Sequence, residues 1–276
     1  MTQKSILITG CSSGIGYDAA HRLHAKGWKV FATCRKAEDV ARLQEEGLIS
    51  CVLDHADTAS MTAALDFCLE QTGRTLDAVF NNGAFACPGA VEDLPTDALR
   101  SVFETNFFGY HELTRQVIPV MRAQGHGRII NCSSVLGLVV MPWRGAYNAS
   151  KFALEGLTHT LRIEMRDTPI DVILIEPGPI TTRIRENSIP HFERWIDWES
   201  SPRRAQYEAQ LRRRLYHKRG KDPHELPPSA VTDKLLQALS AKTPKPCYFV
   251  TTPTYFMSAL RRVLPMRLLD RVIAKA

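Results

Sequence analysis

The fold of this chain is set by the stretch Thr9-Gly10-Cys11-Ser12-Ser13-Gly14-Ile15-Gly16, which follows directly on the apolar run Ile6-Leu7-Ile8. Glycine lets a chain turn tightly and lets its backbone approach a ligand closely. A helix that begins at such a turn points free N–H groups and the positive end of its dipole at bound phosphate. The GxxxGxG spacing differs from the commoner GxGxxG, and a plain strand-to-helix turn is the alternative. Its place at the first strand–helix junction favours a dinucleotide-binding turn.

Apolar strand-like runs and helix-like runs alternate along most of the chain. The strand-like runs are apolar at successive positions rather than at every second one, which is typical of strands buried on both faces. This order predicts an α/β fold with one doubly wound Rossmann-type domain over 1–276, a mostly parallel seven-stranded sheet and helices on both faces. The expected strands are Ser5–Thr9, Trp28–Thr33, Ile49–Leu53, Leu76–Phe80, Arg128–Cys132, Val172–Ile175 and Cys247–Val250. The expected helices are Ile15–Ala25, Ala37–Glu46, Thr58–Gln71, Leu99–Arg122 with an interruption at Pro119, Ala149–Arg166 and Ala230–Leu239.

Two segments depart from this alternation. Residues 183–226 carry no strand signal but hold several aromatic residues among many charges, which predicts a functional insertion that covers the substrate. Residues 255–276 form a basic, amphipathic helix that Pro265 breaks. We expect this helix to close the substrate pocket or to pack on a neighbouring subunit. Weak attachment to an anionic membrane surface is the alternative.

Composition and charge exclude several classes of protein. The 276 residues are 44% hydrophobic, and no apolar run is long enough to span a bilayer. The N-terminus lacks a signal-peptide pattern, so we expect a cytoplasmic protein. The cysteines are scattered without a CxxC pair, which predicts reduced thiols and no metal site. The net charge is +6, and we interpret the basic clusters within 203–219 as a solvated face rather than a nucleic-acid site, because no zinc-finger spacing or RNA-binding motif accompanies them.

The second expected strand runs into Cys34-Arg35-Lys36. NAD-binding folds often place a carboxylate here against the ribose 2′-hydroxyl. A carboxylate would repel a 2′-phosphate, whereas Arg35 binds one through charge-assisted hydrogen bonds. We therefore expect NADP(H), with a solvated Arg-Lys pair as the alternative.

The third and fourth expected strands also end in polar residues. From Asp54 a carboxylate can accept the adenine amino group. The fourth strand runs into Asn81-Asn82-Gly83-Ala84, which suits a ligand crevice and equally suits a local turn closed by an Asn side chain.

Tyr147 and Lys151 are four residues apart, so they share one face of a helix. A phenol has a pKa near ten, and a neighbouring ammonium stabilises the phenolate and lowers that pKa. The pair therefore suits general acid–base chemistry, although the same spacing also occurs by chance on solvated helices. Ser133-Ser134 strengthens the assignment, because it follows an expected strand and a short loop brings it next to Tyr147.

Together these motifs resemble the short-chain dehydrogenase/reductase superfamily. The similarity covers residues 4–182, and the variable ends look most like the hydroxysteroid and retinol dehydrogenase-like subgroup and its bacterial aldehyde-reductase relatives. It implies an NADP(H)-dependent enzyme that interconverts a carbonyl and an alcohol on an apolar substrate. The motifs that carry it are Thr9–Gly16, Asn81–Ala84, Asn106, Ser134, Tyr147, Lys151 and Pro177-Gly178.

Two other functions fit the same fold. Arg35 argues against an NAD-linked alcohol dehydrogenase. The intact set of four catalytic residues argues against a catalytically silent NADP-binding sensor or scaffold. The apolar side chains expected near the pocket are Phe85, Val139, Met141 and Trp143.

The resemblance implies a role for each motif residue. Tyr147 would donate the proton in carbonyl reduction, and Lys151 would bind the nicotinamide ribose and lower the Tyr147 pKa. Ser134, with Ser133 as its alternative, would hydrogen-bond the substrate oxygen, and Asn106 would hold a water in the proton relay. Thr182 would contact the nicotinamide carboxamide. The implied cofactor site comprises Thr9, Gly10, Ser12, Ser13, Gly14, Ile15, Gly16, Arg35, Lys36, Asp54, Asn82, Gly83, Tyr147, Lys151, Pro177, Gly178, Ile180 and Thr182.

Two further expectations come from the resemblance. Helices around Phe107–Met121 and Ala149–Arg166 often pair in relatives, so a homodimer or homotetramer is implied. The family usually reads NNAG where this chain reads Asn81-Asn82-Gly83-Ala84. The exchange of two small residues should keep the turn and shift its backbone amides slightly.

Overall fold

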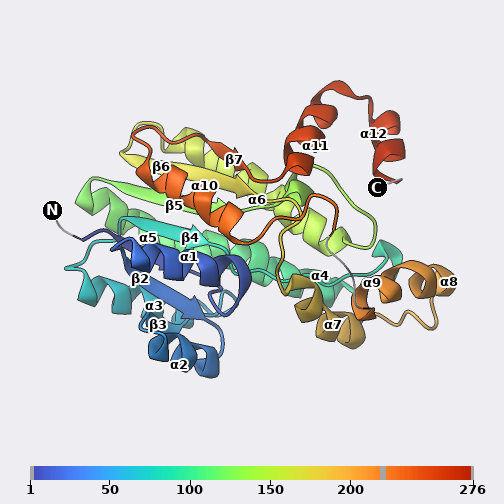
Figure 1. The fold of residues 1–276 in the computed structure, drawn as a ribbon, viewed down its shortest axis with the longest axis horizontal. Helices are drawn as coiled ribbons and strands as arrows, with labels where there is room; N and C mark the ends of the chain where they lie inside the picture. The colour runs from blue at the N-terminus through green and yellow to red at the C-terminus, as the bar shows by residue number, and fades with distance from the viewer. Residues whose placement is uncertain (1–2, 218–221, 275–276) are drawn as a thin grey trace.

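One parallel sheet organises the molecule (Figure 1). The structure is a computed structural model that describes residues 3–217 and 222–274. The strand order is β3-β2-β1-β4-β5-β6-β7, and each neighbouring pair is parallel. This confirms the predicted Rossmann-type domain with seven strands, in a sheet that is entirely parallel. The strands are β1 (Ser5–Ile8), β2 (Lys29–Cys34), β3 (Ile49–Val52), β4 (Ala78–Asn81), β5 (Gly127–Cys132), β6 (Ile170–Glu176) and β7 (Cys247–Phe249).

Helices cover both faces of the sheet (Figure 1). The first core lies under α1 (Gly14–Ala25), α2 (Ala37–Glu45) and α10 (Ser229–Ser240). The second lies under α3 (Thr58–Gln71), α5 (Gly109–Gln124) and α6 (Gly145–Glu164). Successive strand residues point to opposite faces, so Ile6 and Ile8 lie in the first core and Leu7 in the second. Burial on both faces explains why the strands read as unbroken apolar runs.

The order of the strands creates the crevice. The chain lays down β1, β2 and β3 in one direction, then returns to place β4 on the other side of β1. Loops therefore diverge at the carboxyl ends of β1 and β4, the switch point where open α/β sheets bind ligands. The turn that follows Ile8 lies at this point.

The helical region expected at Leu99–Arg122 divides at a different place than the sequence predicted. α4 (Thr96–Phe103) continues through the π-helical turn η2 (Glu104–Phe108) into α5, and Pro119 lies inside α5. The predicted interruption at Pro119 is therefore wrong. Buried Val117 and Met121 hold α5 on the sheet despite the hydrogen bond that proline cannot donate. The irregular turn falls on η2 instead, and such π-turns often mark functional sites.

A helical lobe follows β6 beyond the carboxyl edge of the sheet (Figure 1). It shares a small core with earlier parts of the chain, in which Phe192, Tyr207 and Leu211 pack with Cys87 and Val102. This packing explains why a segment with no strand signal is still ordered. Lys218 and Arg219 of the basic cluster lie outside the described residues. The lobe consists of α7 (Ile184–Trp195), α8 (Arg204–Gln206), η4 (Tyr207–Arg212) and α9 (Arg213–Tyr216).

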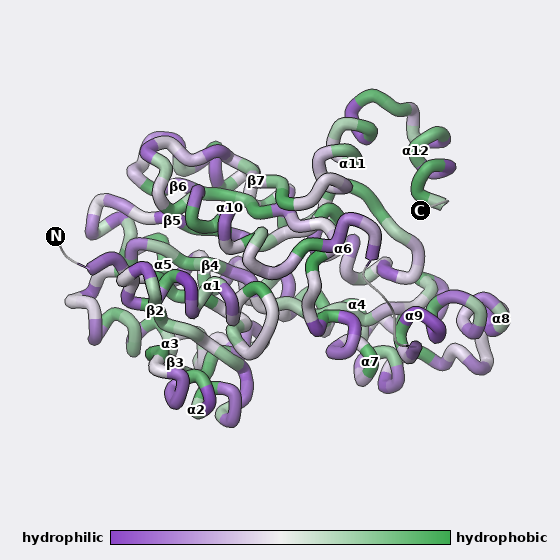
Figure 2. Tube along the Cα trace, in the orientation of Figure 1, coloured by the Kyte–Doolittle hydropathy of each residue, from purple (hydrophilic) through white to green (hydrophobic). Residues whose placement is uncertain are grey.

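The C-terminal segment is a hairpin of two helices that projects from the domain (Figures 1 and 2). α11 (Thr252–Val263) and α12 (Met266–Ile273) meet at Pro265, the expected break. The first helix begins a few residues earlier than predicted, and residues 275–276 of the predicted segment lie outside the described part. No helix in 3–217 or 222–274 is long and apolar enough to cross a membrane.

Candidate active site

The glycine-rich turn after β1 is shaped to let backbone approach a ligand. Gly10 and Gly14 have φ of +71° and +63°, a conformation that favours glycine. A Cβ at Gly10 would lie 2.5 Å from the Cα of Gly83, so the two loops touch backbone to backbone. The N-cap residue of α1, Ser13, makes no side-chain capping bond. The first N–H groups of α1 are therefore uncapped by Ser13, as a phosphate-binding helix end requires.

The loop after β4 is tied to this turn by side chains. The hydroxyl of Thr9 accepts the backbone N–H groups of Asn82, at 2.9 Å, and of Gly83, at 3.1 Å. The Asn82 amide donates to the carbonyl of Thr9 at 3.0 Å. The Asn82 side chain thus bridges β1 and β4 rather than closing a turn of its own. The Gly83-Ala84 order is compatible with this tie.

The cations expected at the adenosine end differ in their partners. Arg35 is exposed just after β2 and makes no ion pair or hydrogen bond with another described residue. Lys36 pairs with Glu38 at 3.1 Å. The Asp54 carboxylate accepts the Ala56 N–H at 3.0 Å, within its own turn. Arg35 is therefore the cation with its charge available to an anion.

Arg42 is a residue of this region that no motif marks. Its guanidinium donates to the carbonyl of Ser12 at 2.8 Å and pairs with Asp39 and Glu46, each at 3.1 Å. It also lies over the ring of Tyr17. Arg42 therefore holds the glycine-rich turn from α2, although in sequence it belongs to an ordinary charged helix.

Lys151 is buried on α6 with its ammonium beneath the end of β5. Its Nζ donates to the carbonyl of Cys132 at 2.7 Å and lies 5.6 Å from the ring centroid of Tyr147. Burial lowers the pKa of Lys151 to about 8, while Cys132 and Glu155 oppose that shift. The ammonium is thus fixed in position next to the phenol.

Tyr147 lies in the first turn of α6, which begins at Gly145 rather than at the expected Ala149. Burial raises the pKa of Tyr147, and the thiol of Cys132 adds to this. A hydrogen bond with Ser134 and the guanidinium of Arg144 lower it, and Lys151, which was expected to lower it, is not among these groups. The structure therefore brings Ser134 to the Tyr147 hydroxyl, as the motif spacing predicts, and adds Arg144 as a nearby cation.

Ser133 and Ser134 have different environments. The Ser133 hydroxyl lies against the buried Glu155 carboxyl, away from the phenol. Ser134 Oγ accepts the N–H of Leu136 at 3.1 Å and lies 3.4 Å from the carbonyl of Pro177. Of the two serines, Ser134 is thus the one next to the Tyr147 hydroxyl, and its contact with a substrate oxygen stays a prediction.

Asn106, in η2, joins the catalytic loops through its side chain. Its Oδ1 accepts the N–H of Phe85 at 3.1 Å, and its Nδ2 donates to the carbonyl of Phe85 at 2.9 Å and to Ser150 Oγ at 3.3 Å. The Ser150 hydroxyl in turn donates to the Tyr147 carbonyl at 2.9 Å. Asn106 therefore positions the loop after β4 and the first turn of α6, and its role in holding a water stays a prediction.

The loop after β6 completes the crevice. A Cβ at Gly14 would lie 3.1 Å from the Cγ2 of Thr182, so this loop crosses the glycine-rich turn. At Gly178 a Cβ would overlap the hydroxyl of Thr251. Ile180 packs on the first core. Of the predicted residues of this loop, Thr182 thus lies directly against the turn after β1.

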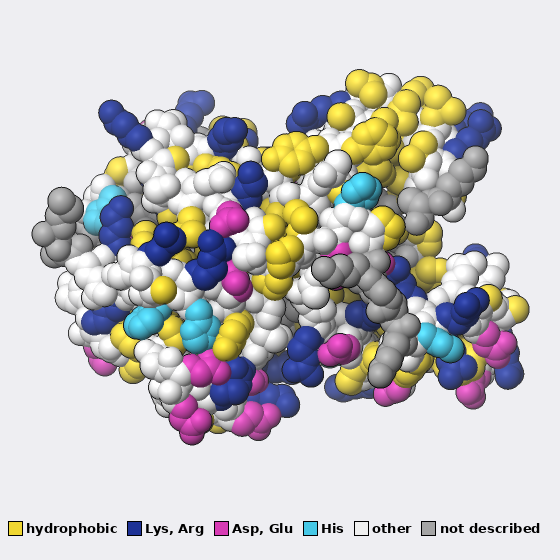
Figure 3. Space-filling view, viewed as in Figure 1, with side chains coloured by type: hydrophobic (Ala, Val, Ile, Leu, Met, Phe, Trp, Pro, Cys, Tyr) yellow, Lys and Arg dark blue, Asp and Glu magenta, His cyan; other side chains and the backbone are white. Residues whose placement is uncertain are grey.

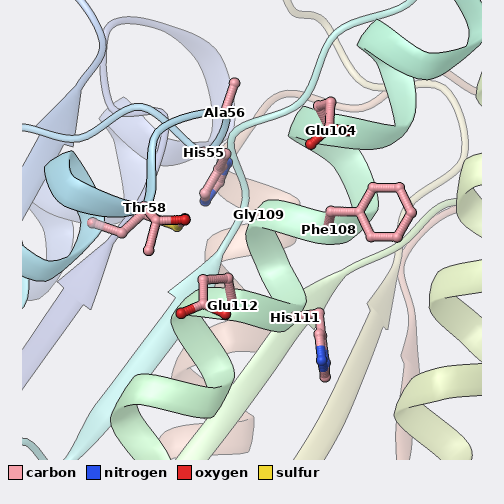
Figure 4. A pocket seen from close by; sticks show the side chains of 9 residues that line it. His55, Ala56, Thr58, Glu104, Phe108, Gly109, His111 and Glu112 are labelled. Atoms are coloured by element: carbon pink, nitrogen blue, oxygen red, sulfur yellow. The ribbon is translucent and has the colours of Figure 1, made fainter.

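His55 is a second residue that sequence reasoning missed. Burial lowers its pKa to about 4, and its ring bonds the backbone of Gly83. It also lines a pocket of about 230 Å³ (Figure 4). The centroid of its ring lies 5.0 Å from that of the Tyr110 ring. His55 therefore supports the Gly83 turn from outside the crevice. The pocket is lined by His55, Ala56, Thr58, Met61, Glu104, Phe108, Gly109, His111 and Glu112.

The lobe meets the catalytic loops through aromatic rings. Phe85 stacks on His191 of α7 with 4.1 Å between ring centroids. Trp143 packs on Tyr207 at 4.8 Å and donates from Nε1 to Gln210 at 3.1 Å. The lobe is therefore joined to the segments on either side of Ser134 by two pairs of stacked or tilted rings.

Comparison with known proteins identifies the family. A sequence model described as short chain dehydrogenase matches residues 4–192. The chain is 38% identical to the oxidoreductase YbbO of Escherichia coli (strain K12) over 98% of this chain and 94% of that protein. It is 30% identical to an NADPH-dependent 3-dehydrocapnine reductase of Ornithobacterium rhinotracheale, over 98% and 95% of the two chains.

A solved structure agrees with this assignment. A short-chain dehydrogenase/reductase of Burkholderia phymatum in complex with NAD superposes with a TM-score of 0.76 and 26% identity, over 95% of this chain and 92% of that one. Fold, sequence pattern and full-length relatives therefore point to one conclusion: this chain belongs to the short-chain dehydrogenase family of oxidoreductases.

Proposed function

We propose that this protein is an NADP(H)-dependent oxidoreductase that reduces an aldehyde or ketone on an apolar substrate to the alcohol. The observation that carries the proposal is the meeting of Ser134, Tyr147 and Lys151 at the carboxyl end of β5, two strands from β1 and its glycine-rich turn at the same edge of the sheet. A phenol, a hydroxyl and an ammonium at one place suit proton transfer to a carbonyl oxygen.

The proposed reaction needs one hydride from the cofactor and one proton from the protein, and it uses three side chains. NADPH, when bound, supplies the hydride for the carbonyl carbon and becomes NADP⁺. Tyr147 donates its proton to the carbonyl oxygen, and Ser134 orients that oxygen by a hydrogen bond. Solvent then reprotonates Tyr147, while Lys151 stabilises the transient phenolate. The product alcohol has gained one hydride and one proton.

The charge at the end of β2 supports NADP(H) rather than NAD(H). Arg35 is exposed and has no partner among the described residues, so it is available to a 2′-phosphate. The similar proteins include an NADPH-dependent reductase and a dehydrogenase whose structure was solved in complex with NAD. Membership of the family therefore does not decide between NADP(H) and NAD(H), and the proposal rests on the charge of Arg35.

The lobe of residues 183–217 is proposed as the cover of the substrate. Its rings contact two aromatic residues of the domain, His191 on Phe85 and Tyr207 on Trp143, and these contacts support the proposal. Aromatic walls exclude water and favour an apolar substrate.

The test is a screen for substrate-dependent NADPH oxidation. It compares aldehydes, ketosteroids, retinals and 3-dehydrocapnine, each with NADPH and with NADH. We expect turnover with at least one apolar carbonyl and a clear preference for NADPH. Tight NADPH binding without turnover of any member would favour the sensor alternative, and equal turnover with NADH would overturn the cofactor assignment.

A further inference from the structure

The α11–α12 hairpin has two apolar faces rather than one. On its inner side Leu269 and Ile273 are 5% and 7% exposed and pack with Val139 of the loop that follows Ser134. On its outer side Val263 is 73% exposed and Met266 71% exposed. The inner face is satisfied by the domain, and the outer face carries large apolar side chains into solvent.

The outer apolar side chains extend over both helices. Figure 3 shows hydrophobic side chains gathered over the hairpin, with basic side chains at its edges. Along α12 the hydropathy alternates sharply (Figure 2). We call this set the hairpin surface; it consists of Tyr255, Phe256, Val263, Met266, Leu268 and Val272 with the four arginines of the hairpin.

The hairpin carries a net positive charge. Its arginines are Arg261, Arg262, Arg267 and Arg271, and its one acidic residue is Asp270, so residues 252–274 carry four positive charges and one negative, a net +3. All four arginines are exposed, and none of them forms an ion pair within the described residues. Exposed apolar groups beside unpaired cations are typical of helices that lie in a membrane interface.

We propose that the hairpin surface docks on the surface of an anionic phospholipid bilayer. The arginines attract the headgroups, and Val263, Met266 and their neighbours enter the boundary between headgroups and acyl chains. Contact is peripheral, because neither α11 nor α12 is long enough to span a bilayer. The docking does not depend on the proposed reaction.

A second copy of the chain fits this surface less well. A two-fold interface presents the same patch from both subunits, so two surfaces of net +3 would face each other. A nucleic acid would pair with the arginines and leave the apolar side chains exposed. The bilayer satisfies both halves of the pattern.

The location of the hairpin gives docking a consequence. Its inner face packs on the loop that contains Val135 and Val139, directly after Ser134. Arg261 lies over the ring of Phe152, the residue after Lys151. A docked hairpin therefore places the mouth of the crevice at the bilayer surface, where an apolar substrate is concentrated.

The test is co-sedimentation of the full chain with vesicles. One vesicle is phosphatidylcholine alone, and the other is phosphatidylcholine mixed with phosphatidylglycerol. We expect pelleting with the anionic vesicle at low salt, little with the neutral one, and loss of pelleting as salt screens the charges.

Two variants and a matched control separate the contributions. Arg267→Glu with Arg271→Glu should lower the partition coefficient at least about tenfold, since each basic residue near an anionic surface contributes about fivefold. Val263→Ser with Met266→Ser should weaken binding at unchanged net charge. The control is Arg166→Glu with Lys242→Glu, an exposed pair at the amino-terminal end of the sheet, which should bind nearly as the wild type. NADPH affinity and the melting temperature verify that each variant is folded.

Three results would overturn the proposal. The first is no lipid-dependent pelleting at low salt. The second is an equal loss in the control and hairpin variants, which would reduce the effect to net charge. The third is a concentration-dependent dimer, seen by light scattering, that the hairpin variants abolish while vesicle binding is absent. That result would assign the surface to a second copy.

Discussion

At the scale of residues, the chemistry of Tyr147 depends on what surrounds its hydroxyl. Burial raises its pKa, so the phenol is protonated at neutral pH and ready to donate. Ser134 and Arg144 favour the phenolate, and Lys151 is held over the ring by the Cys132 carbonyl. If Tyr147 is the acid, as proposed, Ser134 and Arg144 are therefore in place to stabilise the phenolate that it leaves.

Substitution of Lys151 and Ser134 should separate two functions. Lys151→Ala should weaken NADPH binding and lower turnover, because the ammonium is expected to serve both the ribose and the phenolate. Ser134→Ala should lower turnover and leave NADPH affinity unchanged, because its expected partner is the substrate oxygen. Fluorescence titration of NADPH and steady-state rates measure the two effects. A Ser134→Ala variant with weakened NADPH affinity would contradict the assignment, and Ser133→Ala serves as the neighbouring control.

Arg35→Ala tests the choice of cofactor. Loss of a hydrogen bond to a charged group costs about 1.5–3 kcal/mol, so NADPH should bind roughly tenfold or more weakly. NADH lacks the 2′-phosphate and should be little affected. Lys36→Ala is the control, because Lys36 is already paired with Glu38. Equal losses for both cofactors in Arg35→Ala would show that the residue does not read the phosphate.

The residues of the site differ in how visible they are in sequence. Motif residues such as Ser134 and Tyr147 can be found because short spacing fixes their geometry. Arg42 and His55 cannot, because their partners, Ser12 and Gly83, lie 30 and 28 positions away and are reached through the fold. Long-range side-chain contacts of this kind leave no local pattern.

At the scale of elements, the conformation of the turn between β1 and α1 requires a residue without a Cβ atom at Gly10. A Cβ at Gly10 meets the backbone of Gly83, whereas one at Gly47 meets nothing within 4 Å, although both glycines have positive φ. Gly47→Ala should therefore cost about 1–2 kcal/mol of unfolding free energy from backbone strain and keep NADPH binding. Gly10→Ala should cost more and abolish NADPH binding. Chemical unfolding and NADPH titration of the two variants check this, and similar behaviour of both would refute the close-approach argument.

Elements follow from sequence where one physical cause dominates. Strands buried on both faces can be predicted from their unbroken apolar runs, and each strand begins within two residues of its expected first residue. The helix break predicted at Pro119 does not occur, because the packing of Val117 and Met121 outweighs the hydrogen bond that proline cannot donate. The helices of 184–216 were not individually predictable, because their core is shared with Cys87 and Val102, far along the chain.

At the scale of the whole molecule, two buried carboxyls link stability to pH. Burial raises the pKa of Glu155 to about 7 and that of Glu176 to about 8. An unfolded glutamate has a pKa near 4.3, so the folded state holds these protons more tightly. Their contribution to stability is complete below about pH 4.3 and is lost as the pH rises through 7 and 8. Two groups act in the opposite sense: Lys151 above about pH 8, where its lowered pKa lies, and His55 between its lowered pKa of about 4 and the ordinary value near 6.5.

The free energy of unfolding should therefore fall between about pH 5 and pH 7.5 through these two groups. Glu176→Gln keeps the shape, removes the titration and should flatten this slope by up to about 1.4 kcal/mol per pH unit. Glu199→Gln, at an exposed position of the lobe, is the matched control and should leave the slope unchanged. Urea unfolding at a series of pH values measures it, and identical slopes in both variants would exclude the Glu176 carboxyl as a source of the slope.

The architecture assembles these parts at one end of the sheet. The glycine-rich turn, the Ser134 loop, the lobe and the hairpin all lie beyond the carboxyl ends of the strands (Figure 1). The sheet order follows from alternating strand and helix signals, and the crevice follows from that order. The identity of the substrate does not, because it depends on how the lobe and hairpin close over the crevice.

The central claim is that Tyr147 gives the proton in a carbonyl reduction. Tyr147→Phe removes one hydroxyl and keeps the ring, so the fold and NADPH affinity should survive. The decisive measurement is the single-turnover rate of NADPH oxidation by this variant and by the wild type on a substrate that the wild type reduces. The account predicts a fall of roughly 10²–10⁴ in that rate with NADPH binding intact. A Tyr147→Phe enzyme that keeps most of the wild-type rate would contradict it.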